Sequence, residues 1–366
     1  MTEARELPIR RAILLAVVAA VATAVLGGLV RLGFDLGLAW PARHAMDHGP
    51  LFVLGVFGTV IGLERAVAYG AAWGYAAPLV GVASALALLA GLPGSAWGAT
   101  VSSVALLVLN AAIVARQSIA FTWLMLLGSA VLVFGNATLA VGRPVFAVVP
   151  AWIAFFVLTI VAERLELSRL APTPRWATHT LVALSLVFAA SCCAMVAGDA
   201  VALGDATSTR VTGASMVLLA LWQLRFDLAR RTIRLTGLPR YAATGVMIGA
   251  LWLLVAGLLL ATRGLPPAGP AYDAALHAVF VGFVLSMVFA HAPIILPAVA
   301  RIDVPFHPGL YLPLAVLHLG LVSRVWGDVA GVIEGRRFGG MANAVALPLF
   351  LGAVLWARRV AKGRSR

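Results

Sequence analysis

The sequence predicts an all-α polytopic membrane protein, a bundle of about twelve transmembrane helices that forms a single domain over residues 1–366. Of the 366 residues, 62% are hydrophobic and only 11% are charged, whereas an ordinary soluble domain carries roughly a quarter charged residues. The apolar residues gather in runs of about 20, the length that a helix needs to cross a bilayer. These observations exclude a soluble enzyme and leave no room for a domain outside the membrane.

The apolar runs place the spans in order along the chain. The first follows a basic N-terminal stretch, the second and the tenth open beside histidines, and the tenth also contains two prolines. Short loops separate the runs. The predicted spans are 12–30, 49–69, 71–92, 96–115, 119–141, 146–162, 177–200, 209–224, 241–261, 275–299, 309–329 and 338–360.

The basic residues in the loops predict that both termini face the cytoplasm. With the N-terminus inside, the inner segments hold 19 of the 27 Lys and Arg residues and the outer loops hold eight, in agreement with the positive-inside rule. We therefore expect the chain in the inner, cytoplasmic membrane, in contact with lipid and not with nucleic acid. The densest inner patch consists of five arginines that would face anionic lipid, namely Arg225, Arg230, Arg231, Arg234 and Arg240.

Histidines are the candidates for chemistry, because ionisable residues within spans are costly and usually face the interior of the bundle. His44 and His48 precede or open the second span, and His277 opens the tenth, so all three are expected near the outer surface. His44 and His48 share a face if their segment is already helical. Alternatively, Gly49-Pro50 marks the start of the helix, with His48 at its cap.

A second layer of histidines is expected deeper in the membrane. His291 follows His277 by 14 residues, which is about 21 Å at 1.5 Å per residue. Fourteen residues are close to four α-helical turns, so both imidazoles should project from one face. His318, in the eleventh span, lies at a comparable depth. The alternative for His318 is an ordinary hydrogen-bonded structural residue.

Two histidines at equal depth on facing helices are typical of a b-type haem site, in which neutral imidazoles bind opposite faces of the iron. The outer pair would be His277 with His48 or His44, and the deeper pair His291 with His318. The chain has no Cys-x-x-Cys-His motif, which excludes covalent c-type haem. Copper is the alternative metal, held by His44, His48 and His277, because imidazole also suits copper.

Charged residues near the outer surface could support such a cofactor. Arg324 is a candidate partner for a haem propionate, and Asp328 lies one turn beyond it. Asp328 would either form a local ion pair with Arg324 or hold it toward the propionate. Asp47 could support a ligand histidine through the second ring nitrogen of that histidine.

Two further patterns each allow two interpretations. Pro293 and Pro297 should kink the tenth span and free backbone carbonyls, either around a cavity for a ligand or proton, or for packing alone. Gly55, Gly58, Gly62 and Gly282 flank the histidines of the second and tenth spans. Such small residues suit the edge of a haem, but Gly58-x-x-x-Gly62 is equally a helix packing motif.

The stretches Ala-Arg-His44-Ala-Met-Asp-His48-Gly and Leu-His277-Ala-Val-Phe-Val-Gly-Phe, within a twelve-span plan, resemble the NnrS family of haem- and copper-containing membrane proteins associated with nitric oxide metabolism. More distantly, they are similar to subunit I of the haem-copper oxidases and nitric oxide reductases. In that superfamily one histidine from span 2 and one from span 10 hold the low-spin haem b. The resemblance implies this role for His48 or His44 and for His277.

The chain departs from the superfamily at its active site. A His-Pro-Glu-like motif in span 6 and a His-His pair in span 7 are missing, and no second histidine stands two residues after His277. We therefore do not expect an oxygen-reducing copper centre.

The sequence favours a haem b protein in respiratory or nitric oxide-linked redox metabolism, with His48 and His277 as axial ligands. An enzyme of this kind would be a haem-dependent oxidoreductase that works with a respiratory electron donor or another membrane subunit, and a sensor or assembly role without turnover stays open. The alternative function is a secondary transporter or channel for a small solute. Its midplane site would use His291, His318 and the proline-interrupted tenth span.

Overall fold

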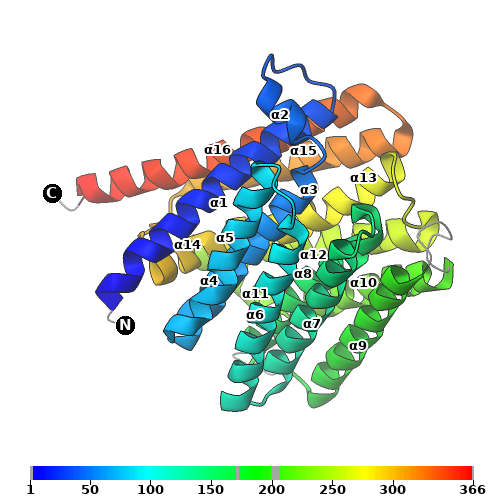
Figure 1. The fold of residues 1–366 in the computed structure, drawn as a ribbon. Helices are drawn as coiled ribbons and strands as arrows, with labels where there is room; N and C mark the ends of the chain where they lie inside the picture. Colours follow the sequence, from blue (N-terminus) through cyan, green and yellow to red (C-terminus); the bar gives the residue numbers. More distant parts are fainter. Residues whose placement is uncertain (1–2, 170–172, 199–205, 365–366) are drawn as a thin grey trace. The chain divides into compact units, whose positions relative to one another are not determined.

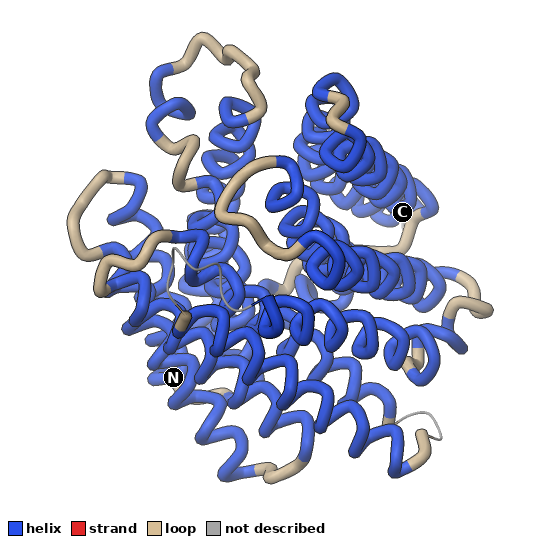
Figure 2. Tube along the Cα trace, turned by 90° about the vertical axis from the view of Figure 1, so that its right-hand side faces the viewer, coloured by secondary structure: helices blue, strands red, loops and turns tan. Residues whose placement is uncertain are grey.

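The computed structural model describes residues 3–169, 173–198 and 206–364, and this part of the chain consists of helices and loops without a strand (Figure 2). Eleven of its helical runs are long and apolar enough to cross a membrane. The prediction of an all-α polytopic membrane bundle is therefore confirmed.

The eleven runs coincide with eleven of the twelve predicted spans. The other predicted span, 209–224, lies within the helix Ala206–Phe226, whose apolar residues are interrupted by Ser, Thr and Gln. The last two residues of the predicted span 177–200 lie outside the described part of the chain.

The contacts of the chain divide it into two compact units. The first unit takes in the chain up to Trp152, together with Ala298–Arg301, and the second takes in Ile153–Pro297 and the chain from Ile302 onward. The first boundary falls inside the helix Val145–Ser168, which is buried along nearly its whole length.

In the first unit, α1 packs against η1 and α5, and α5, α6 and α7 pack against one another in sequence order (Figure 1). The elements are α1 (Glu3–Arg31), α2 (Ala39–Arg43), α3 (His48–Pro50), η1 (Leu51–Gly58), α4 (Thr59–Tyr69), η2 (Ala72–Tyr75), α5 (Ala76–Leu89), α6 (Ser95–Arg116) and α7 (Ala120–Ala140).

The second predicted span is a composite of α3, η1 and α4. Its middle part, η1, is a π-helix of eight residues, a wide helix with i→i+5 hydrogen bonds that mostly occurs as a single turn. The hydroxyl of Thr59 donates to the carbonyl oxygen of Leu54 over 3.2 Å, where the wide segment returns to an α-helix. Gly70, with φ +77°, ends α4, as glycine commonly does at a helix C-terminus.

The second unit contains the rest of α8 (Val145–Ser168) and the helices that follow it, except the last three residues of α14. These are α9 (Arg175–Ala197), α10 (Ala206–Phe226), α11 (Ala229–Thr232), α12 (Gly237–Arg263), α13 (Pro270–His277), η3 (Ala278–Leu285), α14 (Ser286–Ala300), η4 (Pro308–Leu310), α15 (Tyr311–Ala330) and α16 (Ile333–Arg364). Within this unit, α10 packs against both α9 and α12, and α15 and α16 form a hairpin (Figure 1).

The tenth predicted span is likewise a composite, made of α13, η3 and α14. Its middle part, η3, is again a π-helix of eight residues. The following helix, α14, continues through Pro293 and Pro297. Because Pro293 has no N–H, the carbonyl of Phe289 loses its usual helical donor, and the hydroxyl of Tyr241 donates to it over 3.2 Å.

Glycines allow two helices of the second unit to approach at backbone distance. A Cβ on Gly213 of α10 would lie 2.5 Å from the amide nitrogen of Ala261 in α12, and one on Gly257 would lie 2.6 Å from the carbonyl oxygen of Gly213. These neighbours are backbone atoms and cannot rotate away. Small residues at such a crossing are typical of packed membrane helices.

The substitution Gly213→Val should therefore separate α10 from α12 and destabilise the protein by about 1–3 kcal/mol, the usual cost of overpacking. Thermal unfolding in detergent measures the effect. Gly352→Val is the matched control, because no atom lies within 4 Å of a Cβ built on Gly352. Equal melting temperatures for the two variants would contradict this account of the crossing.

Candidate functional site

His48 in the first unit is held by the helix that packs beside it. Its Nδ1 lies 2.8 Å from the carbonyl oxygen of Ala24 in α1, so Nδ1 carries the proton that makes this bond. A Cβ on Gly28, one turn further along α1, would lie 2.8 Å from Nδ1 and 2.9 Å from Cε1 of the same ring. Gly28 thus leaves the space into which the imidazole fits, and Phe52 packs edge-on against it.

His44 lies in the turn before this segment, not on the same helix as His48. It caps the C-terminus of α2, and residues 44–47 form a turn. Its Nδ1 lies 2.9 Å from Oδ2 of Asp47, and the residue is only 6% exposed. Asp47 therefore supports His44 through Nδ1, which is the support that the sequence suggested for a ligand histidine.

His277 in the second unit ends α13 and immediately precedes the π-helix η3. Its Nδ1 lies 2.8 Å from the carbonyl oxygen of Asp273, one turn earlier, and 3.4 Å from the Oδ1 atom of the same residue. The carbonyl fixes the proton on Nδ1, and the carboxylate lies within reach of that proton.

The surroundings of His48 and His277 are alike, although the two residues belong to different units. Each ring has Nδ1 bonded to a main-chain carbonyl, which is the arrangement that leaves the lone pair of a neutral imidazole on Nε2. Each residue leads, within three positions, into a π-helix of eight residues. π-helical segments are rare and frequently mark functional sites.

Asp273 is the centre of a buried charge cluster in the second unit. Arg324 binds it with two parallel hydrogen bonds, from Nε to Oδ2 over 3.0 Å and from Nη2 to Oδ1 over 3.1 Å. Nη2 of Arg336 lies 3.5 Å from Oδ1 of the same carboxylate. Nε of Arg336 also lies 3.1 Å from Oδ1 of Asp328, whose side chain is fully buried.

The cluster differs from the pairing that the sequence suggested. Arg324 binds Asp273 of α13 in place of Asp328 on its own helix, and Asp328 instead faces Arg336 of α16. Asp273 and Arg336 were not predicted as site residues. The spacing of Asp273, four residues before His277, was the available signal, because such residues share a helix face.

His318 has partners at both ring nitrogens. Nε1 of Trp252 donates to its Nδ1 over 3.1 Å. Its Nε2 lies 3.2 Å from Oγ of Ser286, which donates its own proton to the carbonyl of Gly245 over 2.8 Å. These bonds satisfy every polar atom of a neutral ring, so metal ligation by His318 would break one of them.

His291 also has both ring nitrogens engaged, although sequence spacing placed it on one face with His277. The π-helix η3 lies between them and has more residues per turn than an α-helix. The 14 residues from His277 to His291 are therefore not four α-helical turns, and the two imidazoles need not share a face. Nδ1 of His291 lies 2.7 Å from the carbonyl of Met287. Nη1 of Arg164, on α8, lies 2.9 Å from its Nε2.

The same arginine reaches a buried acid between α10 and α11. Nε of Arg164 lies 2.9 Å from Oδ2 of Asp227, whose side chain is 1% exposed. Oδ1 of Asp227 accepts from the amide of Ala229 over 2.7 Å, where α11 begins. Burial raises the pKa of the Asp227 carboxyl, and the Arg164 guanidinium opposes this shift.

The glycines beside the histidines mainly serve packing within their own units. A Cβ on Gly55 would lie 3.1 Å from Cβ of Ala85, and one on Gly62 would lie 3.4 Å from Pro78. Gly282 faces the indole of Trp252, with 2.5 Å between its added Cβ and Cβ of the tryptophan. These observations favour the packing interpretation of the glycines.

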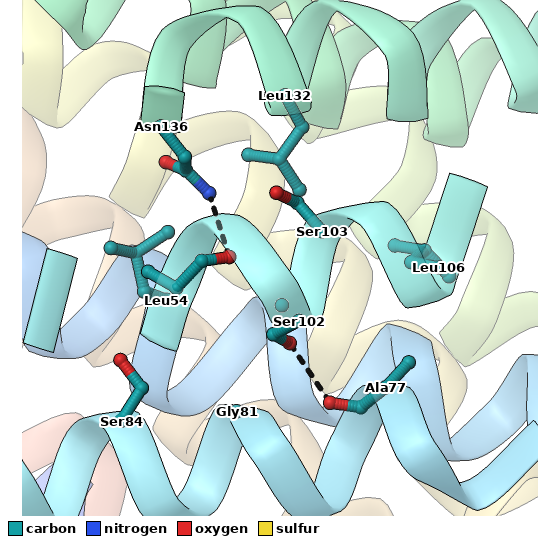
Figure 3. A pocket seen from close by; sticks show the side chains of 11 residues that line it. Leu54, Ala77, Gly81, Ser84, Ser102, Ser103, Leu106, Leu132 and Asn136 are labelled. Atoms are coloured by element: carbon teal, nitrogen blue, oxygen red, sulfur yellow. Dashed lines mark hydrogen bonds between the residues drawn. The ribbon is translucent and has the colours of Figure 1, made fainter. Parts of the chain in front are cut away.

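A small pocket, with a volume of about 20 Å³, lies among η1, α5, α6 and α7 in the first unit (Figure 3). The hydroxyl of Ser102 donates to the carbonyl oxygen of Ala77 over 2.8 Å. The side-chain amide of Asn136 donates to the carbonyl oxygen of Ala99 over 3.4 Å. The hydroxyls of Ser84 and Ser103 also donate to main-chain carbonyl oxygens. No histidine lines this pocket, and its hydroxyls present acceptors to its interior.

Among the residues that the structure describes, no group of three or more His, Cys, Asp or Glu side chains is arranged to hold a metal ion. A metal centre built from protein ligands alone is therefore not visible in this part of the chain. A cofactor such as haem differs, because its macrocycle supplies four ligands and the protein supplies one or two.

Removing the carboxylate of Asp273 should leave the buried guanidinium of Arg324 and the half-buried guanidinium of Arg336 without their shared partner. Breaking a buried ion pair costs about 3–5 kcal/mol, so Asp273→Ala should lower the melting temperature strongly. Asp35→Ala is the control, because Asp35 is exposed and accepts only a local bond from Gly37. A melting temperature for Asp273→Ala equal to that of Asp35→Ala would mean that the cluster does not stabilise the fold.

Comparison with known proteins gives a family for nearly the whole chain. No curated protein matches the sequence. Residues 10–359 match the model of a family that is described as a domain of unknown function, DUF8744. The chain therefore belongs to the DUF8744 family.

Proposed function

We propose that this membrane protein binds a b-type haem, with His48 and His277 as its axial ligands, and acts in respiratory or nitric oxide-linked redox metabolism. Bound haem would supply the electron-transfer or gas-binding chemistry. The protein would supply the two imidazoles, their burial and their hydrogen-bonded supports.

The observation that carries the proposal is the shared setting of the two histidines. Each ring donates its Nδ1 proton to a main-chain carbonyl, so the neutral form of each imidazole carries its lone pair on Nε2. This is the state in which histidine ligates a metal, and a bond from the other nitrogen fixes the orientation of the ring. A π-helix follows each histidine, and the other long helices of the described chain carry none.

Asp273 would act as a positioning residue for His277. It lies beside Nδ1–H of the ring and is itself fixed by the paired hydrogen bonds from Arg324. A carboxylate behind a ligand histidine raises the basicity of that ligand. Arg324, expected at a haem propionate, supports the ligand through Asp273 in this arrangement.

The deeper pair of histidines is engaged at both nitrogens of each ring. Both ring nitrogens of His291 and of His318 already have partners, so a haem at the deeper pair would require several hydrogen bonds to break. His44 keeps its lone pair on Nε2 through the bond to Asp47, and it is the alternative ligand on the outer side. Copper, for which the sequence suggested His44, His48 and His277, is the alternative to haem, and these three side chains do not form a ready-made site in the described structure.

The membrane location, the orientation of the termini and the partners are proposed from sequence patterns. The basic loops favour an inner-membrane location with both termini in the cytoplasm. A redox role implies a respiratory electron donor or another membrane subunit as partner. An oxidoreductase and a sensor or assembly factor would use the same ligand set.

The test is a reduced-minus-oxidised absorption spectrum of the purified protein from haem-replete cells, with metal and pyridine haemochrome analysis of the same sample. We expect a b-type α-band that is lost in His48→Ala and in His277→Ala, because each change removes one axial ligand. His179→Ala is the control, since His179 is exposed at the start of α9, and it should leave the spectrum unchanged.

A colourless and metal-free protein would refute haem and copper binding. The histidines would then be structural or proton-handling residues, and transport of a small solute would become the leading function. A haem spectrum that survives both His48→Ala and His277→Ala would keep the cofactor but refute these ligands.

A second test displaces the ring of His48 without removing it. Gly28→Ala places a methyl group against Nδ1 and Cε1 of His48, so we expect an altered or weakened α-band. Gly49→Ala is the matched control, because Gly49 adjoins His48 and has no atom within 4 Å of an added Cβ. Identical spectra for both variants would contradict His48 as a ligand.

A further inference from the structure

We propose that the loop between α10 and α12 is a binding surface for the headgroups of anionic phospholipids. The loop runs from Arg225 to Arg240 and includes the short helix α11. This proposal does not depend on haem binding, because it rests on a different set of residues.

The surface of the loop carries five positive charges without an acidic partner. All five arginines of the segment are exposed, and in the described part of the chain none of them forms an ion pair. To the described residues, their guanidinium groups make one hydrogen bond, from Nη1 of Arg230 to the carbonyl of Arg225 over 3.3 Å, and the Arg225 guanidinium also lies 5.0 Å from the centre of the Phe226 ring. The guanidinium groups are therefore available to an external anion.

The single acid of the loop is turned away from this surface. Asp227 is 3% exposed, binds Arg164 of α8 through Oδ2 and caps α11 through Oδ1. Its carboxylate cannot neutralise the exposed arginines while it makes these contacts. The same contacts fix the start of α11 against the bundle, which gives the arginines a defined scaffold.

Apolar residues at the same edge place the loop beside a bilayer. Trp222 at the end of α10 donates to the carbonyl of Ala177 over 2.8 Å, which joins the end of α10 to the start of α9. Trp176, 61% exposed, packs edge-on against Phe226. Exposed tryptophan is typical of the membrane interface, and Leu235 in the loop is 51% exposed as well.

This combination favours lipid over an acidic protein or free phosphate. A lipid headgroup lies at the depth of interfacial tryptophans, and an anionic leaflet presents many phosphates to a string of arginines. A polybasic segment beside membrane helices is the usual sequence signal for such binding. Arg175, also exposed at the start of α9, adds a sixth charge to the same edge.

The experiment compares lipid preference in the intact protein, reconstituted in phosphatidylcholine nanodiscs with spin-labelled phosphatidylglycerol or spin-labelled phosphatidylcholine. An arginine near an anionic surface changes binding by about fivefold, and salt screens part of this effect. We therefore expect Arg231→Gln combined with Arg234→Gln to lower the preference for phosphatidylglycerol by at least about twofold. A variant in which all five arginines of the loop are replaced by Gln should abolish this preference.

The matched control removes two exposed arginines from the opposite ends of the same helices, as Arg210→Gln in α10 with Arg263→Gln in α12. The preference should survive in this variant. An equal loss in control and loop variants, or no loss in the variant that lacks all five arginines, would overturn the proposal. Equal competition by millimolar inorganic phosphate would also overturn it, since a free-anion site would then explain the binding.

Discussion

In an apolar helical bundle, a polar side chain that is buried without a partner is costly, because no water replaces a missing hydrogen bond. This constraint accounts for the hydrogen bonding of the buried histidines and for the charge clusters. His318 is closed between Trp252 and Ser286, and Arg10 of α1 binds both Glu6 and Tyr75. Nδ1 of His48 and Nδ1 of His277 are bonded to main-chain carbonyls, and we propose that Nε2 of each ring binds the cofactor.

The constraint also explains why charges gather where helices begin and end. Asp273 lies in the first turn of α13, where a carboxylate is favoured by the helix dipole, and Arg336 lies near the start of α16. Glycines let α15 and α16 approach closely beside this cluster, since a Cβ on Gly339 of α16 would clash with the amide nitrogen of Arg324 in α15. The ion cluster thus depends on a close backbone approach that larger residues would prevent.

The sequence predicted the helices well and the interactions within them less well. Runs of apolar residues determine where a chain can span a bilayer, so eleven of twelve predicted spans match long apolar helices. The π-helices escaped prediction because Leu51–Gly58 and Ala278–Leu285 are almost wholly apolar and show no period. The pairing of Arg324 with Asp273 escaped for another reason: the partner stands 51 residues away in the chain, and only the packing of α13 on α15 brings them together.

The two π-helices η1 and η3 make the direction of His48 and His277 sensitive to the loss of a single residue. A turn with i→i+5 bonds holds one residue more than an α-helical turn, so losing one residue from Leu51–Gly58 or Ala278–Leu285 would restore ordinary winding. Each residue of an α-helix turns the chain by about 100°. A single codon deletion would therefore swing the preceding histidine around the axis of its span while leaving the rest of the span in register. One inserted or deleted residue in such a segment would thus change the direction in which the histidine points.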